Sequence, residues 1–319
     1  MRVLVTGGAG FIGSNFVRYM LQKYPKYEIV NLDKLTYAGR TENLSDVEDD
    51  EKYTFIKGDI CNSVDVEKAM KGCDLVVNFA AESHVDRSIE DASAFVRTNF
   101  EGVRVMLESA MKQNVKKFIQ IGTDEVYGSV EKGSSTENDL IKPKNPYSAA
   151  KAAADLLALS YFNTYELPVV VTRSSNNYGP YQFPEKLIPR FVTNLIQGKK
   201  VPIYGDGLNV RDWLYVLDNC EAIDVCLHKG KNGEIYNIGG GNEVSNLEIT
   251  KRILSELGKG KEMIEHVKDR KGHDRRYSLD SGKIKKKLGW TPKKNFEKGI
   301  KETVKWYAEN ETWWTLLVK

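Results

Sequence analysis

A glycine-rich segment near the start of the chain constrains the fold more than any other feature. Residues 6–13, with the sequence TGGAGFIG, directly follow an apolar run at 3–5 and precede a helix-compatible run at 14–23. The segment satisfies G-x-G-x-x-G, and also the related G-x-x-G-x-x-G, through Gly7, Gly8, Gly10 and Gly13. A strand, a glycine turn and a helix in this order let the backbone approach a pyrophosphate at the helix N-terminus. The alternative is a glycine turn that only lets the helix pack on the sheet.

The first half of the chain alternates short β-branched runs with amphipathic stretches, which is typical of βαβ units. Strands are expected at residues 3–5, 28–32, 53–56, 75–79, 118–121 and 169–172. After about residue 175 this alternation breaks and prolines mark loops. We therefore predict an α/β fold with two parts. Residues 1–175 form a doubly wound parallel Rossmann sheet that binds the cofactor and bears the catalytic residues. Residues 176–319 form a smaller C-terminal α/β substrate-binding lobe, part of which can return to the first domain.

An acidic residue at the end of the second expected strand specifies the cofactor. Asp33 lies 20 residues beyond Gly13, where a carboxylate bonds ribose hydroxyls and repels an added 2′-phosphate, so NAD is favoured over NADP. Asp59 and Ile60 follow the third strand and are expected near the adenine. Ala80 and Ala81 follow the fourth and are expected along the nicotinamide half.

Composition favours a small molecule as partner. The formal charge is +3, which is too small to indicate a nucleic-acid or membrane-surface binder. No apolar run approaches the roughly 20 residues that span a bilayer, and no cleavable signal pattern is present, so we expect a cytoplasmic protein. The four cysteines form no C-x-x-C pair and suit reduced thiols. The four histidines lack metal-ligand spacing, so we expect no metal.

Two apolar stripes at helical spacing bear on the oligomeric state. They span residues 95–111 and 150–162 and look wider than one sheet contact requires. Ordinary core packing and pairing with a second subunit both explain such stripes. We expect a homodimer.

Two pairs of residues carry chemistry. Tyr147 and Lys151 lie four apart, on one face of a helix, where the ammonium can lower the pKa of the phenol so that it takes a proton from an alcohol. Asp124 and Glu125 follow the fifth strand, at the edge where ligands bind in open α/β sheets. Two adjacent carboxyl groups at this edge can act as an acid and a base on a bound molecule.

The glycine motif and the Tyr147–Lys151 pair resemble those of the extended short-chain dehydrogenase/reductases, the NAD-dependent epimerase/dehydratase family. Over nearly its whole length the chain resembles the dTDP-glucose 4,6-dehydratases within that family. The matching stretches are residues 33–39, 80–88, 123–125, 176–189 and 272–277.

The resemblance implies a redox-neutral hydro-lyase. NAD takes hydride from C4 of dTDP-glucose, water leaves across C5 and C6, and the hydride returns to C6 to give dTDP-4-keto-6-deoxyglucose. It implies Tyr147 as base for the C4 hydroxyl, with Lys151 beside it, and Thr123 bonded to the C4 oxygen. Asp124 would be the acid for the C6 hydroxyl and Glu125 the base at C5. It also implies deoxysugar biosynthesis, with dTDP-L-rhamnose for polysaccharide as the expected product.

The resemblance further implies two sets of binding residues. Those implied for NAD are Gly7, Gly10, Phe11, Ile12, Gly13, Asp33, Lys34, Thr36, Asp59, Ile60, Ala80, Ala81, Ser83, Thr98, Tyr147, Lys151 and Asn177. Those implied for the sugar nucleotide are Ser83, Thr123, Asn176, Lys186, Leu187, Pro202, Tyr204, Arg211, Asn246, Arg270 and His273. Lys271 stands where the family usually has proline, which bears on the contacts of Arg270.

Two alternative functions remain at this point. A sugar-nucleotide 4-epimerase or decarboxylase on the same fold would leave the Asp124–Glu125 pair without a task. A non-catalytic NAD-binding protein would typically lack Tyr147 or Lys151, and both are present.

Overall fold

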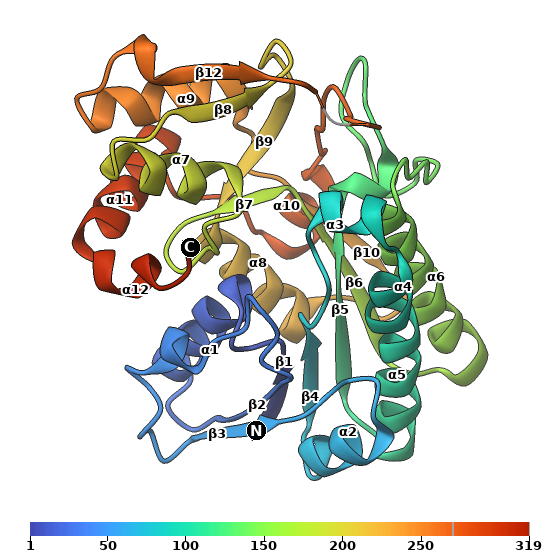
Figure 1. Ribbon diagram of the computed structural model, residues 1–319. Coiled ribbons are helices and arrows are strands. Elements are labelled where there is room, and N and C mark those ends of the chain that lie inside the picture. The colour runs from blue at the N-terminus through green and yellow to red at the C-terminus, as the bar shows by residue number, and fades with distance from the viewer. Residues whose placement is uncertain (270, 319) are drawn as a thin grey trace.

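The computed structural model describes residues 1–269 and 271–318, and within these residues the main sheet has seven parallel strands. Their order is β10-β6-β5-β4-β1-β2-β3 (Figure 1). The strands are β1 (Arg2–Thr6), β2 (Glu28–Asp33), β3 (Tyr53–Lys57), β4 (Leu75–Asn78), β5 (Lys117–Thr123), β6 (Val169–Ser174) and β10 (Ile235–Ile238). The six strands expected from the sequence are confirmed. The seventh, β10, was not predicted.

Helices cover both faces of this sheet, so the predicted doubly wound fold is confirmed (Figure 1). One face carries α2 (Ser63–Met70), α5 (Gly102–Lys112) and α6 (Pro146–Tyr165), whose apolar residues form a core with β4, β5 and β6. The other face carries α1 (Phe11–Lys23), α8 (Val216–Lys229) and α10 (Gly282–Leu288). Apolar side chains of these elements are removed from water on both sides of the strands, which is the main stabilising contribution.

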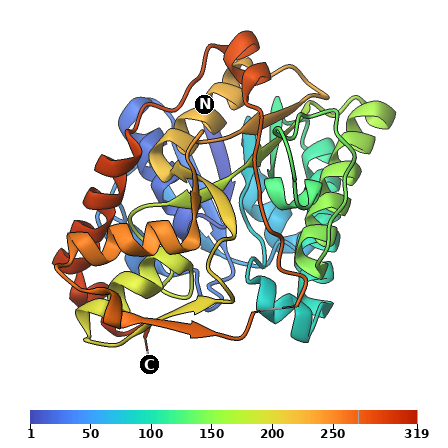
Figure 2. The same cartoon turned by 90° about the horizontal axis from the view of Figure 1, so that it is seen from above.

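A second lobe lies over one end of the sheet (Figures 1 and 2). Its helices are α7 (Leu187–Ile196), α9 (Asn246–Glu256), α11 (Phe296–Glu309) and α12 (Glu311–Thr315). Its strands are β7 (Asn176–Tyr178), β9 (Val210–Tyr215) and β11 (Glu243–Ser245) in one small sheet, and β8 (Val201–Tyr204) with β12 (Ile264–Val267) in another. A separate apolar core joins these elements. The boundary at residue 175 remains a prediction, and α8 and β10, which follow it in sequence, lie on and in the main sheet.

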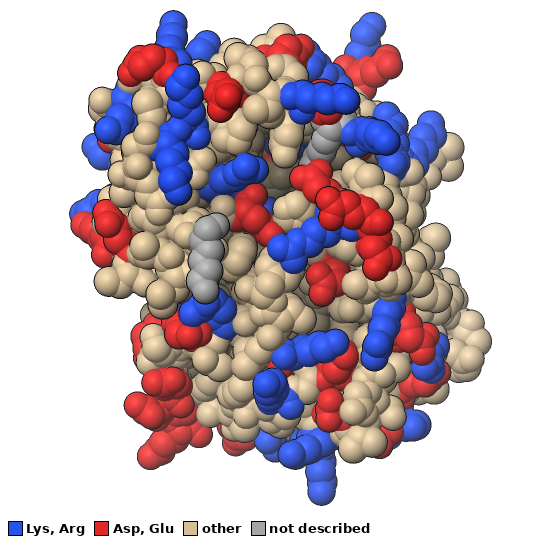
Figure 3. All heavy atoms as spheres, viewed as in Figure 1, with Lys and Arg blue, Asp and Glu red and all other residues tan. Residues whose placement is uncertain are grey.

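Short elements complete the chain between these units. They are the helices α3 (Val85–Glu90) and α4 (Ser93–Val96), a π-helical turn (Arg97–Glu101), and 3-10 turns at Thr41–Leu44, Asp124–Tyr127 and Lys261–Met263. On the face seen in Figure 3, acidic and basic side chains are interspersed over both lobes. No helix in residues 1–269 or 271–318 combines the length and the apolar character that crossing a membrane requires.

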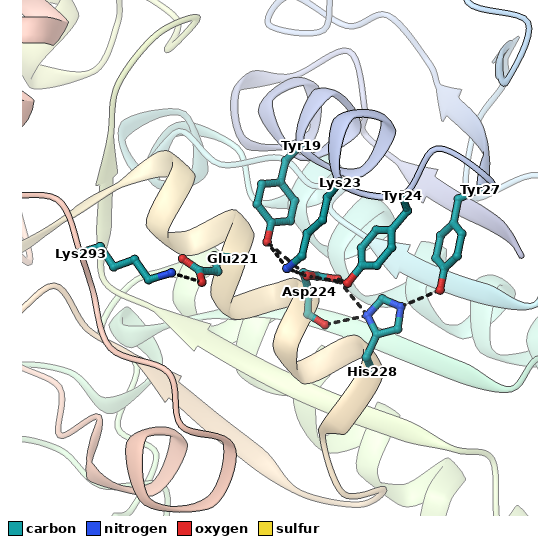
Figure 4. A network of polar contacts seen from close by, with 8 residues as sticks. All are labelled: Tyr19, Lys23, Tyr24, Tyr27, Glu221, Asp224, His228 and Lys293. Carbon is teal, nitrogen blue, oxygen red and sulfur yellow. Dashed lines mark hydrogen bonds and ion pairs between the residues drawn. The ribbon is translucent and has the colours of Figure 1, made fainter.

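A polar cluster joins α1 to α8 (Figure 4). The buried carboxylate of Asp224 accepts hydrogen bonds from Lys23 Nζ at 2.7 Å, Tyr24 OH at 3.0 Å and Tyr19 OH at 3.2 Å, and pairs with His228 Nδ1 at 2.8 Å. Burial acts to raise the pKa of Asp224, but the His228 and Lys23 contacts outweigh burial and lower it. This cluster ties the helix that follows the glycine turn to the second half of the chain.

The cysteines are thiols, as expected from their spacing. Cys73, Cys220 and Cys226 are buried and Cys61 is half-buried. Burial raises the pKa of Cys61 to about 11 and that of Cys73 to about 12, so neither is a thiolate at neutral pH.

Candidate active site

A cleft of about 340 Å³ opens at the carboxyl ends of β1 to β6. Its lining includes the glycine turn, the residues that follow each of these strands, and the start of the second lobe. Every residue predicted to bind NAD lines this cleft, and so does each of the five predicted catalytic residues. Loops at this edge of a parallel sheet converge on one point, which explains why segments far apart in sequence meet here.

The glycine turn fits a dinucleotide phosphate. Gly7 has φ of +67°, and a Cβ there would lie 2.7 Å from the backbone nitrogen of Ala80. A Cβ at Gly13 would collide with the carbonyl oxygen of Gly7. Gly10, the N-cap of α1, has no side chain to occupy the space before the helix N-terminus, so the first-turn N–H groups remain for an anion.

Asp33 and its neighbours line the side of the cleft where the sequence predicts the adenosine of NAD. The Asp33 carboxylate accepts hydrogen bonds from the backbone nitrogens of Ala9 and Leu35, at 2.9 and 2.8 Å. Burial raises its pKa, and these two bonds act against burial. Lys34 Nζ forms an ion pair with Asp59 at 2.8 Å, and both residues are predicted to bind the cofactor.

The carboxyl pair lies where β5 ends. Thr123 is the last residue of β5, and its Oγ1 accepts from the backbone nitrogen of Glu125 at 3.3 Å and donates to Asp124 Oδ1 at 3.2 Å. Asp124 is buried, and Glu125 is half-buried. Burial first, then the charge of Glu125, raises the pKa of Asp124 well above its ordinary value. The raised pKa favours the protonated form of Asp124, which is the form that can donate a proton.

Tyr147 and Lys151 lie on α6, which begins under a capping box of Asn145 and Ser148. Both are buried. Lys151 Nζ donates to the backbone oxygen of Ile121 on β5. The structure therefore places this pair beside the loop that bears the carboxyl pair.

The side chains around Tyr147 do not give it the low pKa that the sequence predicts. Burial first, then the charge of Glu125, raises the pKa of Tyr147 well above its ordinary value, while a hydrogen bond with Thr123 lowers it. Burial also lowers the pKa of Lys151. The sequence argument considered the lysine alone and did not include desolvation or the two carboxyl groups.

The structure divides the predicted sugar-nucleotide residues into two groups. Ser83, Thr123, Asn176 and Lys186 line the cleft. The other described ones lie outside its lining, on the second lobe and the segment after β12, and they are Leu187, Pro202, Tyr204, Arg211, Asn246 and His273. Arg270 lies outside the described residues.

Arg211 of the second group lies near the carboxyl pair. Arg211 is buried, donates to the backbone oxygen of Asp274 at 3.0 Å, and lies 4.3 Å from the ring centre of Tyr277. The charge of Arg211 lowers the pKa of Asp124, so the two groups are close enough to interact. His273 Nδ1 bonds Asp269 at 2.6 Å, and its ring contacts Tyr204 edge-on at 6.3 Å.

Proteins of known function have sequences similar to this chain. Residues 4–303 match the family model described as GDP-mannose 4,6 dehydratase. A dTDP-glucose 4,6-dehydratase of Streptomyces niveus is 52% identical, over 98% of this chain and 95% of that protein. The chain belongs to the dTDP-glucose 4,6-dehydratase family. The resemblance seen in the sequence is thereby confirmed.

Solved structures of the dTDP-glucose 4,6-dehydratase family have the same fold. DesIV from Streptomyces venezuelae, solved with NAD bound, is 50% identical with a TM-score of 0.98, over 99% of this chain and 100% of that one. The Bacillus anthracis dTDP-glucose 4,6-dehydratase, in complex with NAD, is 53% identical with a TM-score of 0.94, over 99% of both chains. The likeness extends over both lobes and not only over the sheet.

Sequence reasoning about this family member missed a contact between the two lobes at the edge of the cleft. Tyr37 OH donates to Glu185 Oε1 at 2.8 Å, and the Arg87 guanidinium lies 3.7 Å from the centre of the Tyr37 ring. Lys186 Nζ donates to the backbone oxygen of Ser83 at 2.8 Å. Burial, and next the charge of Glu185, raises the pKa of Tyr37, so the phenol remains a donor. Tyr37 and Glu185 are 148 residues apart, and no local pattern indicates their contact.

We expect the Tyr37→Phe variant to release NAD about tenfold faster, because it loses a hydrogen bond to a carboxylate that joins the two lobes over the cleft. The measurement is the dissociation rate of NAD from the loaded protein. Tyr236→Phe, which alters a hydroxyl on β10 far from this contact, serves as the control. Equal release rates for Tyr37→Phe and the parent protein would show that this contact does not help to retain NAD.

Among the described residues, no three His, Cys, Asp or Glu side chains gather into a group that could hold a metal ion.

Proposed function

We propose that this protein is a dTDP-glucose 4,6-dehydratase that uses NAD and acts as a hydro-lyase. The observation that carries the proposal is the meeting of two functional pairs in one cleft. Tyr147 and Lys151 come from α6, Asp124 and Glu125 follow β5, and both pairs share the cleft with the glycine turn. An epimerase or decarboxylase would need only the first pair. The second pair supports elimination.

The cleft residues can divide the reaction as follows. NAD, when bound, supplies the hydride acceptor for C4 and a positively charged ring that favours the phenolate form of Tyr147. Tyr147 takes the proton of the C4 hydroxyl, and Thr123 bonds the C4 oxygen. Because Tyr147 is buried and its own surroundings oppose ionisation, we propose that it becomes a base only in the loaded site.

The Asp124–Glu125 pair then carries out the elimination of water. The C4 ketone makes the C5 hydrogen acidic, and Glu125 takes that proton. Asp124 gives its proton to the C6 hydroxyl, which leaves as water. Its Oδ2 is buried and has no hydrogen-bond partner among the described residues, so this oxygen can face a ligand. The raised pKa of Asp124 suits the acid role. The hydride then returns to C6 and Glu125 returns a proton to C5, so the sequence involves no net oxidation.

We propose that the two groups of polar residues divide the substrate. Ser83 and Asn176, in the cleft, hold the glucose. Lys186 and the residues beyond the cleft hold the nucleoside diphosphate, with Arg211 near enough to the carboxyl pair for its charge to act on Asp124. Guanidinium groups match the charge of a diphosphate. Leu187, Pro202, Tyr204, Asn246 and His273 complete this surface, together with Arg270.

The broader setting is also a proposal. We propose that the protein acts in the cytoplasm as a homodimer and supplies deoxysugar biosynthesis, with dTDP-L-rhamnose as the end product. The dimer is supported by apolar side chains that α4 and α6, together with the end of α5, leave exposed, namely Val96, Leu156 and Met111. Most of both predicted stripes, by contrast, packs in the core of the monomer.

The deciding experiment is the product mass after incubation with dTDP-glucose, and separately with UDP-glucose, without added reductant. We expect loss of one water from the dTDP sugar. An unchanged mass with a new C4 epimer would contradict the dehydratase assignment and the roles of the carboxyl pair. Faster conversion of the UDP sugar would contradict the assigned nucleotide.

A further inference from the structure

A buried ion pair lies beneath the catalytic pair, and neither sequence nor family comparison assigned it a task. Asp155 follows Tyr147 and Lys151 on α6 at the same spacing of four, so the three side chains lie on one face of the helix. Its Oδ2 accepts from Arg173 Nε at 2.9 Å, and the exposed fractions of the two side chains are 0% and 1%. A buried ion pair contributes little to net stability, so a functional reason for it is worth seeking.

A glycine on β5 leaves space for the Asp155 carboxylate. Arg173 on β6 pairs in register with Gly122 on β5 and Asn237 on β10. A Cβ at Gly122 would lie 2.8 Å from Asp155 Oδ2, so only glycine leaves room for the carboxylate there. Gly122 immediately precedes Thr123. The strand that bears the carboxyl pair is therefore in direct contact with Asp155.

The same ion pair reaches the carboxyl loop through Arg173. Arg173 Nη1 donates to Tyr127 OH at 2.9 Å, and Tyr127 OH donates to Asn237 Oδ1 at 2.8 Å. Tyr127 ends the 3-10 turn that contains Asp124 and Glu125. One network thus joins the helix of the redox pair to the turn of the elimination pair.

Asp155 also sets the charge environment of Lys151. Burial disfavours the ammonium and lowers the pKa of Lys151, and the negative charge of Asp155 raises it. Burial raises the pKa of Asp155 as well, and Arg173 opposes burial most strongly. The Arg173 guanidinium stays charged and bonds Asp155 directly, which favours the ionised form of this carboxyl group. Asp155 Oδ1 is buried and accepts no hydrogen bond from residues 1–269 or 271–318, so its charge is only partly offset by neighbours.

We propose that Asp155 is a positioning residue that keeps Lys151 charged and thereby favours the phenolate–ammonium form of the Tyr147–Lys151 pair. When the pair has lost one proton, it is either phenolate with ammonium or phenol with amine. Asp155 is one helical turn from Lys151 and two from Tyr147, so its field stabilises an ammonium more than it disfavours a phenolate. Arg173 holds Asp155 in place.

The other charges near the pair come from the neighbouring elements. Those that act on Tyr147 or on the carboxyl groups beside it are Asp124 and Glu125 of the 3-10 turn, and Arg211 and Asp212 of β9. None of these is altered in the variants below.

The first test measures the pKa of Lys151 directly and requires no substrate. The pKa of Lys151 is read from the pH titration of isotope-labelled lysine by NMR, with the Lys151 signal assigned by its loss in Lys151→Met. We expect a pKa about one unit lower in Asp155→Asn. Asp224→Asn, which removes another buried and paired carboxylate on α8, is expected to leave it unchanged. An unchanged pKa in folded Asp155→Asn would overturn the proposal.

Asp155→Asn alone leaves Arg173 buried without its partner and can fail to fold for that reason. The double variant Asp155→Asn/Arg173→Met removes both charges and keeps the test valid. The charge that raises the pKa of Lys151 is that of Asp155, so we expect the same lowered pKa in the double variant. A Lys151 pKa equal to that of the parent protein, in a folded double variant, would overturn the proposal.

The second test rests on the proposed function and measures formation of reduced nicotinamide from dTDP-glucose in a single turnover, as a function of pH. In Asp155→Asn we expect the whole pH profile to move about one unit toward acid and its maximum to fall about tenfold. A purely structural defect would lower the amplitude and leave the profile in place, and that result would refute the positioning role. If the parent protein forms no reduced nicotinamide, the proposed function fails, and the Lys151 titration still decides the present proposal.

Discussion

Tyr147→Phe is expected to abolish hydride transfer. The variant keeps the buried ring and its edge-on contact with Phe95 at 6.3 Å, and loses only the oxygen that can take the C4 proton. We expect single-turnover formation of reduced nicotinamide from dTDP-glucose to fall roughly 10²- to 10⁴-fold, the usual range for loss of a general base. Because dehydration requires prior oxidation at C4, water loss should fall by the same factor.

Tyr165→Phe is the matched control for this variant. It removes a hydroxyl from the same helix, at an exposed position near the helix end, and should retain the parent rate. NAD content is measured for both variants, because Tyr147 also lines the cofactor cleft. Parent-like oxidation in a Tyr147→Phe variant that retains NAD would exclude Tyr147 as the base.

Features that follow from local pattern were predicted well. The strands of the main sheet are buried on both faces, so they appear in the sequence as short β-branched runs. The glycine turn is also largely local, since Gly13 is required by its contact with Gly7 in the same strand–turn–helix unit, whereas the close approach of Gly7 is to Ala80 after β4. The spacing of Tyr147 and Lys151 needs only a helix to become a shared face.

Features that depend on distant segments were not predicted. Strand β10 is four residues long and pairs with β6, more than 60 residues earlier, after loops that end the regular alternation. The contact of Tyr37 with Glu185 joins both lobes across 148 residues. No periodicity within either segment indicates these partners.

The role proposed for Asp155 could not be predicted from its spacing in the sequence alone. Its spacing of four from Lys151 is as plain in the sequence as that of Tyr147. Its meaning depends on Arg173, which only the pairing of β5 with β6 brings beneath α6. The pKa of Tyr147 was missed for a similar reason, because two of the carboxyl groups that raise it, Asp124 and Glu125, come from the 3-10 turn after β5 and not from α6.

Glu125→Gln is expected to separate oxidation from elimination. The amide has nearly the shape of the carboxylate and cannot take the C5 proton at neutral pH. Tyr147 and Lys151 are untouched, so reduced nicotinamide should form at close to the parent rate and then persist. We expect dehydration to fall roughly 10²- to 10⁴-fold. In deuterated water, the 4-keto sugar released from the variant should carry no deuterium at C5, whereas the parent's product should carry one.

Glu131→Gln provides the matched control, because Glu131 is an exposed residue six positions further along the same loop. It should accumulate no reduced nicotinamide and should dehydrate at the parent rate. Two results would contradict the role of Glu125. Deuterium at C5 in the Glu125→Gln product would place the base elsewhere in the cleft. Loss of nicotinamide reduction itself would mean that Glu125 acts before elimination and not only as the base at C5.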